Sequence, residues 1–164
     1  MMKTFSIGGI HPSDKKISKD CKIEVLPLPS KVFVSMAQHL GAPATPVVKA
    51  GDIVKVGQVI AEPAGFISAF VHSPVSGTVK SVGPRKDLAG NNMVHVEIDV
   101  EGDEWAEGID ISSEIITSIP EDNKAILDKI KMNGVVGLGG ATFPTHVKLC
   151  PPPGKKADCL ILNG

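Results

Sequence analysis

Short runs of β-branched residues, separated by glycine turns, fill residues 32–100 and limit what this chain can fold into. Two turns that pair glycine with a polar residue begin at Gly51 and Gly57, between pairs of valine and isoleucine. Over residues 93–100 every second residue is branched and apolar, which predicts a strand with one buried face. That face consists of Val94, Val96, Ile98 and Val100. The other face carries His95, which we expect to be solvated. These patterns predict an all-β unit and exclude a helical bundle.

The composition agrees with a β-rich fold of modest size. The chain has 164 residues, enough for one medium domain or two small ones, and 42% of them are apolar. Aromatic residues make up only 4% and tyrosine is absent, so the core must consist of valine, isoleucine, leucine and alanine. The net charge of −1 supplies no general attraction for nucleic acid, and we expect no nucleic-acid partner.

The cysteines and the N-terminal residues bear on the compartment. Cys21, Cys150 and Cys159 are odd in number and widely spaced, so they predict no disulfide framework and favour a reducing compartment. We expect all three to be structural. The first residues lack the apolar region of a signal peptide, and no stretch approaches the roughly 20 apolar residues of a membrane helix. The chain is therefore predicted to be soluble by itself, with docking onto a membrane complex left open.

Changes in composition divide the chain into four parts. Residues 1–30 are interrupted by prolines and predict an extended N-terminal segment, and residues 31–101 contain the predicted strands. Residues 102–117 are acidic and turn-rich and predict a linker, whose lone Trp105 we expect to plug a domain junction. Residues 118–164 predict a truncated beginning of an α/β nucleotide-binding domain, with a helix, a glycine loop, a proline turn and a strand at 157–162. Because a buried strand closes the sequence, we expect the chain to be a fragment.

The predicted helix has recognisable start and stop signals. Ser118 and Glu121 match a capping box, with Pro120 in the first turn. Gly134 is expected to end the helix, because glycine adopts the left-handed conformation of a helix C-terminus at little cost. Apolar residues supply the face that we expect to be buried: Ala125, Ile126, Leu127 and Ile130.

The glycine loop at residues 134–148 is where several ligand-binding features converge. Its glycines occupy positions 134, 137, 139 and 140, and Lys148 follows shortly afterwards. Glycines permit positive φ and let a ligand approach backbone N–H groups, while a lysine supplies charge for an anion such as phosphate. A Walker A loop is excluded because Gly140 stands where lysine is required. A Rossmann fingerprint is excluded because Thr142 occupies the third glycine position. The residues by themselves leave a cofactor cradle and a structural turn equally open.

The strand-rich part resembles the barrel-sandwich hybrid of biotinyl and lipoyl domains. The resemblance lies in a Gly-Asp-x-Val-x-x-Gly-Gln stretch from Gly51 and a Ser-Pro-x-Ser-Gly-x-Val stretch from Ser73. A weak repeat of residues 43–49 at 74–80 agrees with a small pseudo-symmetric barrel. In carrier members of that family, a lysine at the hairpin tip between these stretches bears the prosthetic group. No lysine occurs between Lys55 and Lys80, so we expect the fold without the carrier chemistry.

The glycine loop is similar to the flavin-binding loop of the NADH-oxidising subunit of respiratory complex I, whose pattern is Gly-Arg-Gly-Gly-Ala-Gly-Phe-Pro-Thr-Gly-x-Lys. Leu138, Thr142 and His146 depart from that pattern. The matching residues are Gly137, Gly139, Gly140, Ala141, Phe143, Pro144, Thr145 and Lys148.

Four motifs in order along the chain resemble the RnfC family, the peripheral subunits of Rnf electron-transport complexes. They are Phe-x-x-Gly-Gly-Ile-His-Pro at residues 5–12, Gln-His-x-Gly-Ala-Pro-Ala at 38–44, the two glycine turns, and the glycine loop. The related A subunit of sodium-pumping NADH:quinone reductase shares this layout but fits the opening motif less well.

The resemblance implies a subunit that passes electrons between NAD(H) and ferredoxin in a membrane complex coupled to ion translocation. FMN and NADH would contact Gly137, Gly139, Gly140, Ala141, Thr142, Phe143, Thr145 and Lys148. Phe143 would either pack on a ring face or anchor the loop in the core. The family's 4Fe-4S clusters would lie beyond Gly164, and we predict no metal site and no catalytic residue in this part. Its partners would be the other Rnf subunits, on the cytoplasmic side of the membrane.

A second interpretation assigns no redox role to the strand-rich part. A carrier-like fold that has lost its lysine is also what a docking module would retain. Residues 30–100 would then be a non-catalytic interaction module that joins this subunit to its membrane partners.

Overall fold

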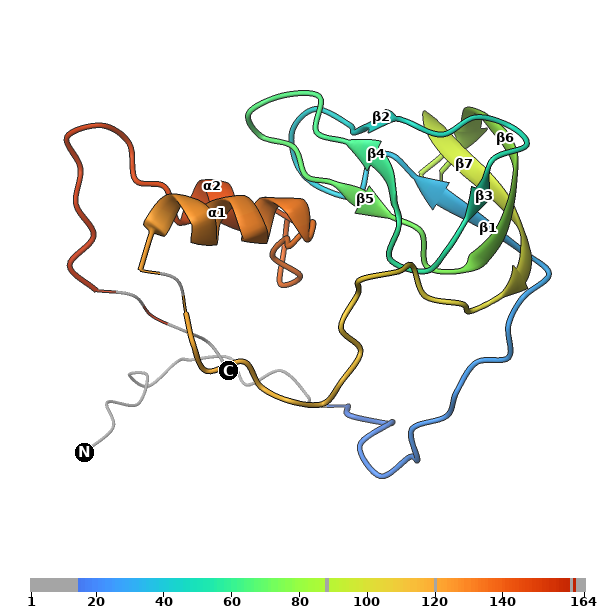
Figure 1. Cartoon of the computed structure of the whole chain (residues 1–164), viewed down its shortest axis with the longest axis horizontal. Coiled ribbons are helices and arrows are strands. Elements are labelled where there is room, and N and C mark those ends of the chain that lie inside the picture. The colour runs from blue at the N-terminus through green and yellow to red at the C-terminus, as the bar shows by residue number, and fades with distance from the viewer. Residues whose placement is uncertain (1–14, 88, 120, 160, 162–164) are drawn as a thin grey trace.

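The strands form two antiparallel sheets that enclose one core, as seen in a computed structural model that describes residues 15–87, 89–119, 121–159 and 161 (Figure 1). The opening motif at residues 5–12 lies outside the described residues. The four-stranded sheet has the order β1-β7-β6-β3, and the three-stranded sheet has the order β2-β4-β5. The strands are β1 Lys31–Ser35, β2 Thr45–Pro46, β3 Ile53–Val54, β4 Val59–Glu62, β5 Val71–His72, β6 Ser76–Lys86 and β7 Asn92–Gly102. The prediction of an all-β unit in this part of the chain is confirmed.

Branched aliphatic side chains from both sheets fill the core. The predicted apolar face of β7 is confirmed at its centre, where Val96 and Ile98 are fully buried, but Val94 is 41% exposed near the end of the strand. Val34 lies opposite Val96 in the register of β1 and β7, so the two sheet neighbours cover one another. The remaining core is contributed mainly by Met36, Val54, Ile60, Ala61, Val71, Val75 and Val79.

The two glycine turns have the chemistry that the sequence predicts. Gly51 and Gly57 adopt φ values of 92° and 79°. This region of backbone conformation is unfavourable for any residue that has a Cβ atom. In the first turn the Asp52 carboxylate accepts a hydrogen bond from the Lys49 N–H at 2.9 Å. In the second, the Gln58 side chain accepts one from the Lys55 N–H at 3.1 Å. These local bonds fix the connections on either side of β3.

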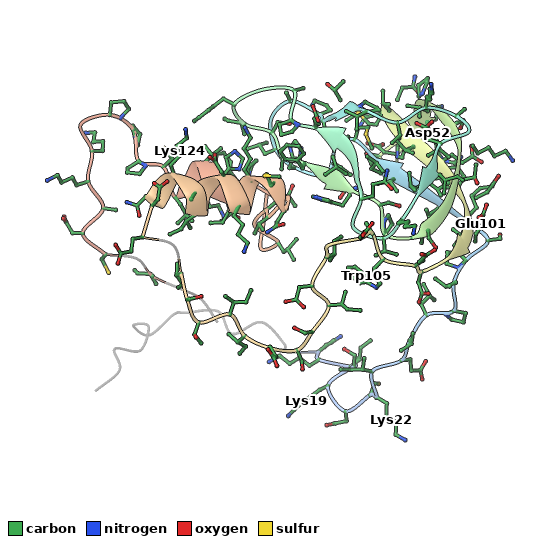
Figure 2. All side chains as sticks on the ribbon, in the orientation of Figure 1. Lys19, Lys22, Asp52, Glu101, Trp105 and Lys124 are labelled. Carbon is green, nitrogen blue, oxygen red and sulfur yellow. The ribbon has the colours of Figure 1, made fainter. Side chains whose placement is uncertain are left out.

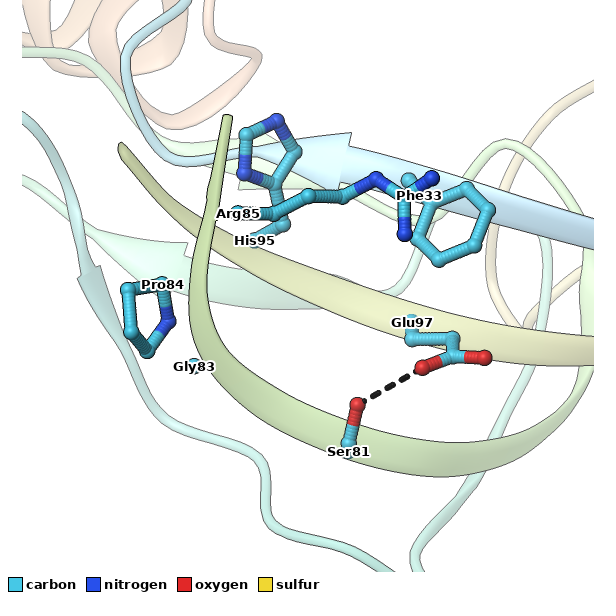
Figure 3. A pocket seen from close by; sticks show the side chains of 7 residues that line it. All are labelled: Phe33, Ser81, Gly83, Pro84, Arg85, His95 and Glu97. Atoms are coloured by element: carbon cyan, nitrogen blue, oxygen red, sulfur yellow. Dashed lines mark hydrogen bonds between the residues drawn. The ribbon is translucent and has the colours of Figure 1, made fainter. Parts of the chain in front are cut away.

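The outer face of the four-stranded sheet carries charged and aromatic side chains (Figure 3). The Arg85 guanidinium lies 3.6 Å from the centre of the Phe33 ring, a cation–π contact. Glu97 accepts a hydrogen bond from the Ser81 hydroxyl at 2.8 Å and pairs with Lys31 at 2.7 Å. His95 lies on this face, as predicted, but it is half-buried because these neighbours surround it.

Two helices follow the barrel: α1 Asn123–Met132 and α2 Thr145–Lys148. The predicted capping box at Ser118 and Glu121 is wrong. Asp122 caps α1 instead, accepting a hydrogen bond from the Lys124 N–H at 2.9 Å, because aspartate is as good a cap as serine and directly precedes the helical residues.

The predicted stop of α1 is confirmed. Gly134 has φ 64°, and its N–H donates to the Lys131 carbonyl while the Val135 N–H donates to the Ile130 carbonyl, as in a Schellman motif. The predicted burial of the apolar face is wrong within the described part of the chain. Ile126, Leu127 and Ile130 are half-buried, and Ala125 is exposed.

Beyond α2, the predicted strand at 157–162 does not form over the described residues 157–159 and 161. A strand satisfies its backbone polar groups on a neighbouring strand, and this segment pairs with none in the described structure. The cysteines were expected to be structural, but Cys21, Cys150 and Cys159 are exposed free thiols. None of the described helices is both long enough and apolar enough to cross a membrane.

The segment between the barrel and α1 contacts the barrel near Val56. Trp105 forms an isolated parallel bridge with Val56, supported by hydrogen bonds from Val56 N to Glu104 O and from Ala106 N to Val56 O. Figure 2 shows Trp105 on the segment that follows β7. Its side chain lines a cleft of about 660 Å³ together with His72 of the barrel and Met132 of α1. Trp105 therefore lies at the predicted junction, but it is 48% exposed and does not plug it.

Candidate cofactor-binding loop

Residues 136–144 form a short, closed loop between the two helices. An isolated antiparallel bridge joins Val136 to Pro144, and the Gly137 N–H donates to the Phe143 carbonyl at 3.0 Å. The Thr145 N–H donates to the Val135 carbonyl, also at 3.0 Å, so the base of the loop is fixed by hydrogen bonds on both sides. Pro144 is buried, and α2 begins directly after it. The projecting residues 138–142 are therefore held in place at both ends of the loop.

The tip of this loop is open backbone. Leu138 is 87% exposed, and Gly139, Gly140 and Ala141 are also exposed. A Cβ built on Gly139 or Gly140 would meet no atom within 4 Å, so space remains on the side where a side chain would project. Within the described part of the chain, no hydrogen bond occupies the N–H groups of Gly139 and Gly140. These two donors are available to an acceptor from outside.

Lys148 brings a positive charge back to the base of the same loop. Its Nζ lies 2.5 Å from the position that a Cβ on Gly137 would occupy, so the glycine leaves the space that the ammonium group takes. Lys148 is the last residue of α2 and is exposed. The amine and the open N–H groups are therefore parts of one small structural unit.

Thr142 departs from the related loop pattern at a position with an unusual backbone. Among the described non-glycine residues it is the one with positive φ, at 51°. The related pattern has glycine here, and a β-branched residue in this region is strained. Its hydroxyl donates to the Ala141 carbonyl at 2.7 Å, and its own carbonyl accepts from the Leu40 N–H at 3.3 Å. Gly137, Gly139 and Gly140 do not have positive φ. Glycine therefore matters at these positions because it leaves room where a Cβ would be, and not because of its backbone conformation.

His146 replaces a glycine of the related pattern and is oriented toward the barrel. Its Nδ1 is buried without a hydrogen-bond partner in the described structure. Burial lowers the pKa of His146 from its ordinary value of 6.5, and the nearby charge of Lys131 lowers it further. The Phe66 backbone acts in the opposite direction by hydrogen bonding. The ring is thus favoured in its neutral form between α2 and the barrel.

The depressed pKa predicts a pH dependence. The unfolded chain binds a proton at His146 more readily than the folded chain, so protonation of this residue favours unfolding. The contribution of neutral His146 to the free energy of unfolding is therefore complete above pH 6.5 and is lost as the pH falls below that value. His72 adds in the same direction, because burial lowers its pKa too. We expect the denaturant concentration at the unfolding midpoint to decrease when the pH is lowered from about 7.5 to about 5.5. In His146→Gln that decrease is expected to be smaller. An unchanged pH slope in His146→Gln, measured by denaturant titration, would contradict this account.

The structure places all of the predicted site residues in one unit, and other residues contact that unit. Gly137, Gly139, Gly140, Ala141, Thr142, Phe143, Thr145 and Lys148 all belong to the closed loop and the short helix after it. Phe143 is half-buried, which leaves both of its predicted roles open. The barrel residues Leu40 and Phe66, which contact this unit, and Phe70, which contacts Gly134 just before it, were not predicted from the sequence. Only the motif at residues 38–44 gave a signal for any of them.

Comparison with known proteins agrees with both parts of this architecture. The model of the RnfC barrel-sandwich hybrid domain matches residues 3–103, and the model of the Nuo51 FMN-binding domain matches residues 130–164. The predicted fold class is confirmed by these matches. Fold and loop thus define a barrel-sandwich hybrid followed by a segment similar to the Nuo51 FMN-binding domain. The chain belongs to the RnfC family.

Named relatives extend over the whole chain, and each is the C subunit of its complex. The chain is 45% identical over 169 residues to that of the proton-translocating ferredoxin:NAD(+) oxidoreductase complex of Clostridium ljungdahlii, covering 100% of this chain and 35% of that protein. It is 43% identical over 159 residues to that of the Na(+)-translocating ferredoxin:NAD(+) oxidoreductase complex of Acetobacterium woodii, covering 96% and 35%. It is 37% identical over 169 residues to that of the ion-translocating oxidoreductase complex of Rhodobacter capsulatus, covering 99% and 32%. The chain spans about a third of the length of these curated relatives.

Proposed function

We propose that residues 137–148 bind FMN in a subunit that passes electrons between NAD(H) and ferredoxin in an ion-translocating membrane complex. The observation that carries the proposal is the pair of N–H groups at Gly139 and Gly140, which bond to no other described residue and lie close in the chain to the Lys148 amine. The match to an FMN-binding domain over residues 130–164 and the names of the relatives support it.

The residues of the loop fit an anionic, planar cofactor. Open backbone without Cβ atoms lets an oxygen approach the Gly139 and Gly140 N–H groups, which would donate hydrogen bonds to it. Lys148 would place a positive charge beside a phosphate or a reduced ring, where negative charge increases. FMN, when bound, accepts a hydride and releases its electrons one at a time. The chain's own task is to bind and orient the cofactor, with Ala141, Thr142, Phe143 and Thr145 completing the contact surface.

The remaining assignments follow from the same proposal. NADH would deliver its hydride at this loop, and the 4Fe-4S clusters would be bound by residues beyond Gly164. Ferredoxin and the other subunits of the complex would be the partners, with this subunit peripheral on the cytoplasmic side of the membrane. We further propose residues 1–30 as an extended segment, 31–101 as the barrel, 102–117 as a linker and 118–164 as the start of the FMN domain. The docking module without a redox role is less favoured, because the match to the FMN-binding domain adds a cofactor function.

The direct test is Lys148→Ala in the full-length protein. Removing a charge beside a bound anion is expected to weaken FMN binding about tenfold, corresponding to about 1.4 kcal/mol. FMN affinity is measured by the quenching of flavin fluorescence on titration, and NADH oxidation is followed in parallel. Lys155→Ala is the matched control, since Lys155 is an exposed lysine in the following turn. If the wild-type protein binds no flavin, or Lys148→Ala binds it as tightly as Lys155→Ala, the proposal is wrong.

A further inference from the structure

The loop between β4 and β5 occupies the place where carrier domains of this fold present their lysine. In this chain it is fixed to the barrel instead of free to swing. The Ser68 hydroxyl, fully buried, donates to the Ala42 carbonyl at 2.9 Å and accepts from the Ala64 N–H at 3.2 Å. The Ala42 N–H in turn donates to the Ile67 carbonyl at 3.1 Å. These bonds join residues 63–70 to residues 39–42 as one rigid surface.

A buried histidine strengthens the same connection. His39 accepts a hydrogen bond at Nε2 from the Ala69 N–H, at 3.1 Å, so this nitrogen carries no proton. Its Nδ1 therefore bears the proton and donates to the Leu40 carbonyl at 3.2 Å. Both ring nitrogens are thereby satisfied in the neutral state. We call residues 39–42 and 63–70, with the adjoining backbone of residues 71–72, the barrel seat.

The glycine loop, residues 134–148, contacts the barrel seat at three points. The Leu40 N–H donates to the Thr142 carbonyl at 3.3 Å, which is at the tip of the cofactor loop. At the end of α1, a Cβ on Gly134 would lie 2.5 Å from the Phe70 carbonyl oxygen and 3.3 Å from His72 Nδ1, so backbone meets backbone there. In α2, the neutral ring of His146 lies against the Phe66 backbone. Figure 1 shows the loop between β4 and β5 reaching toward α1 and α2.

We propose that the barrel seat is a positioning element that holds the glycine loop in its cofactor-binding conformation. A loop of exposed N–H groups loses conformational entropy when a ligand orders it, and a fixed support removes part of that cost in advance. The hairpin that elsewhere bears a cofactor thus supports, in this chain, the loop of a cofactor bound by the neighbouring unit. This inference rests on the proposed function for the identity of the ligand, but the contacts that it invokes exist without the ligand.

The first test disturbs the contact between the seat and the glycine loop without changing the seat or residues 137–148. Gly134→Ala introduces a Cβ against the Phe70 carbonyl, and Gly154→Ala is its control, because Gly154 has a similar φ of 77° but open space around it. In the ligand-free chain, exchange of the hydrogen-bonded amides of Thr145, Val147 and Lys148 is expected to accelerate about tenfold in Gly134→Ala and to stay unchanged in Gly154→Ala. In the full-length protein, the Kd for FMN is expected to rise about tenfold in the first variant only.

A second pair of variants controls for a general loss of structure. Ser68→Ala removes the hydroxyl that ties the two halves of the seat, and Ser73→Ala removes a hydroxyl that is equally buried but bonds to Val75, outside the seat. Faster exchange of the Thr145, Val147 and Lys148 amides in Ser68→Ala, but not in Ser73→Ala, supports the proposed role of the seat. Equal exchange in both members of each pair, with the barrel folded, overturns it. If the wild-type protein binds no FMN, the proposed function fails, and the exchange comparison still decides whether the barrel holds the loop.

Discussion

Replacing Gly41 with alanine is expected to lower the free energy of unfolding by about 3 kcal/mol. About 1 kcal/mol comes from the backbone, because Gly41 has φ 100°, which disfavours any residue with a Cβ. The rest arises because the new Cβ would overlap the Ile67 backbone carbonyl oxygen, which cannot move without breaking its hydrogen bond with the Ala42 N–H. Urea denaturation followed by circular dichroism measures the difference.

Gly51→Ala separates these two contributions. Gly51 has φ 92°, close to that of Gly41, but a Cβ there would meet no atom within 4 Å. Its substitution is therefore expected to cost only the backbone part, about 1 kcal/mol. Equal losses in the two variants would show that the contact with Ile67 contributes nothing and that residues 39–42 adapt freely.

Truncating Ile98 to alanine is expected to cost about 3 to 4 kcal/mol. Ile98 is fully buried at the centre of β7, where it lies opposite Val32 of β1 and Val79 of β6, and the surrounding strands cannot collapse into the space it leaves. The same denaturation experiment measures the loss.

The control for Ile98 comes from the same strand. Val94→Ala removes a branched side chain that is 41% exposed, so we expect a loss below about 1 kcal/mol. Similar losses for Ile98→Ala and Val94→Ala would mean that β7 does not pack against the core as described.

The barrel was predictable because its signals are local. Alternation along β7 and the two turns at Gly51 and Gly57 depend on residues that are near neighbours in the chain, and both are found in the structure. Errors occurred where a second segment decides the outcome. The strand at 157–162 needs a partner strand that the described residues do not supply, and the apolar face of α1 needs a surface to cover it.

In the candidate site, too, local features could be predicted from the sequence, whereas contacts with distant segments could not. Glycine density and Lys148 identified the loop, and the closed loop at 136–144 brings those residues together. The sequence could not assign the positive φ to Thr142, because a β-branched residue there contradicts local preference. Nor could it find the hydrogen bond from Leu40 to Thr142, which joins residues about a hundred positions apart. Contacts between separate units are set by tertiary packing and leave no periodic signal.

Trp105 gives the molecule a single optical reporter. The chain has no tyrosine and no second tryptophan, so its near-ultraviolet emission comes from one indole. That indole lines the same cleft as His72 of the barrel and Met132 of α1, and it is about half exposed to water. Its emission wavelength therefore responds to the separation of those two elements, and a flavin bound nearby would quench it by energy transfer. Binding and docking can consequently be followed by fluorescence without a label.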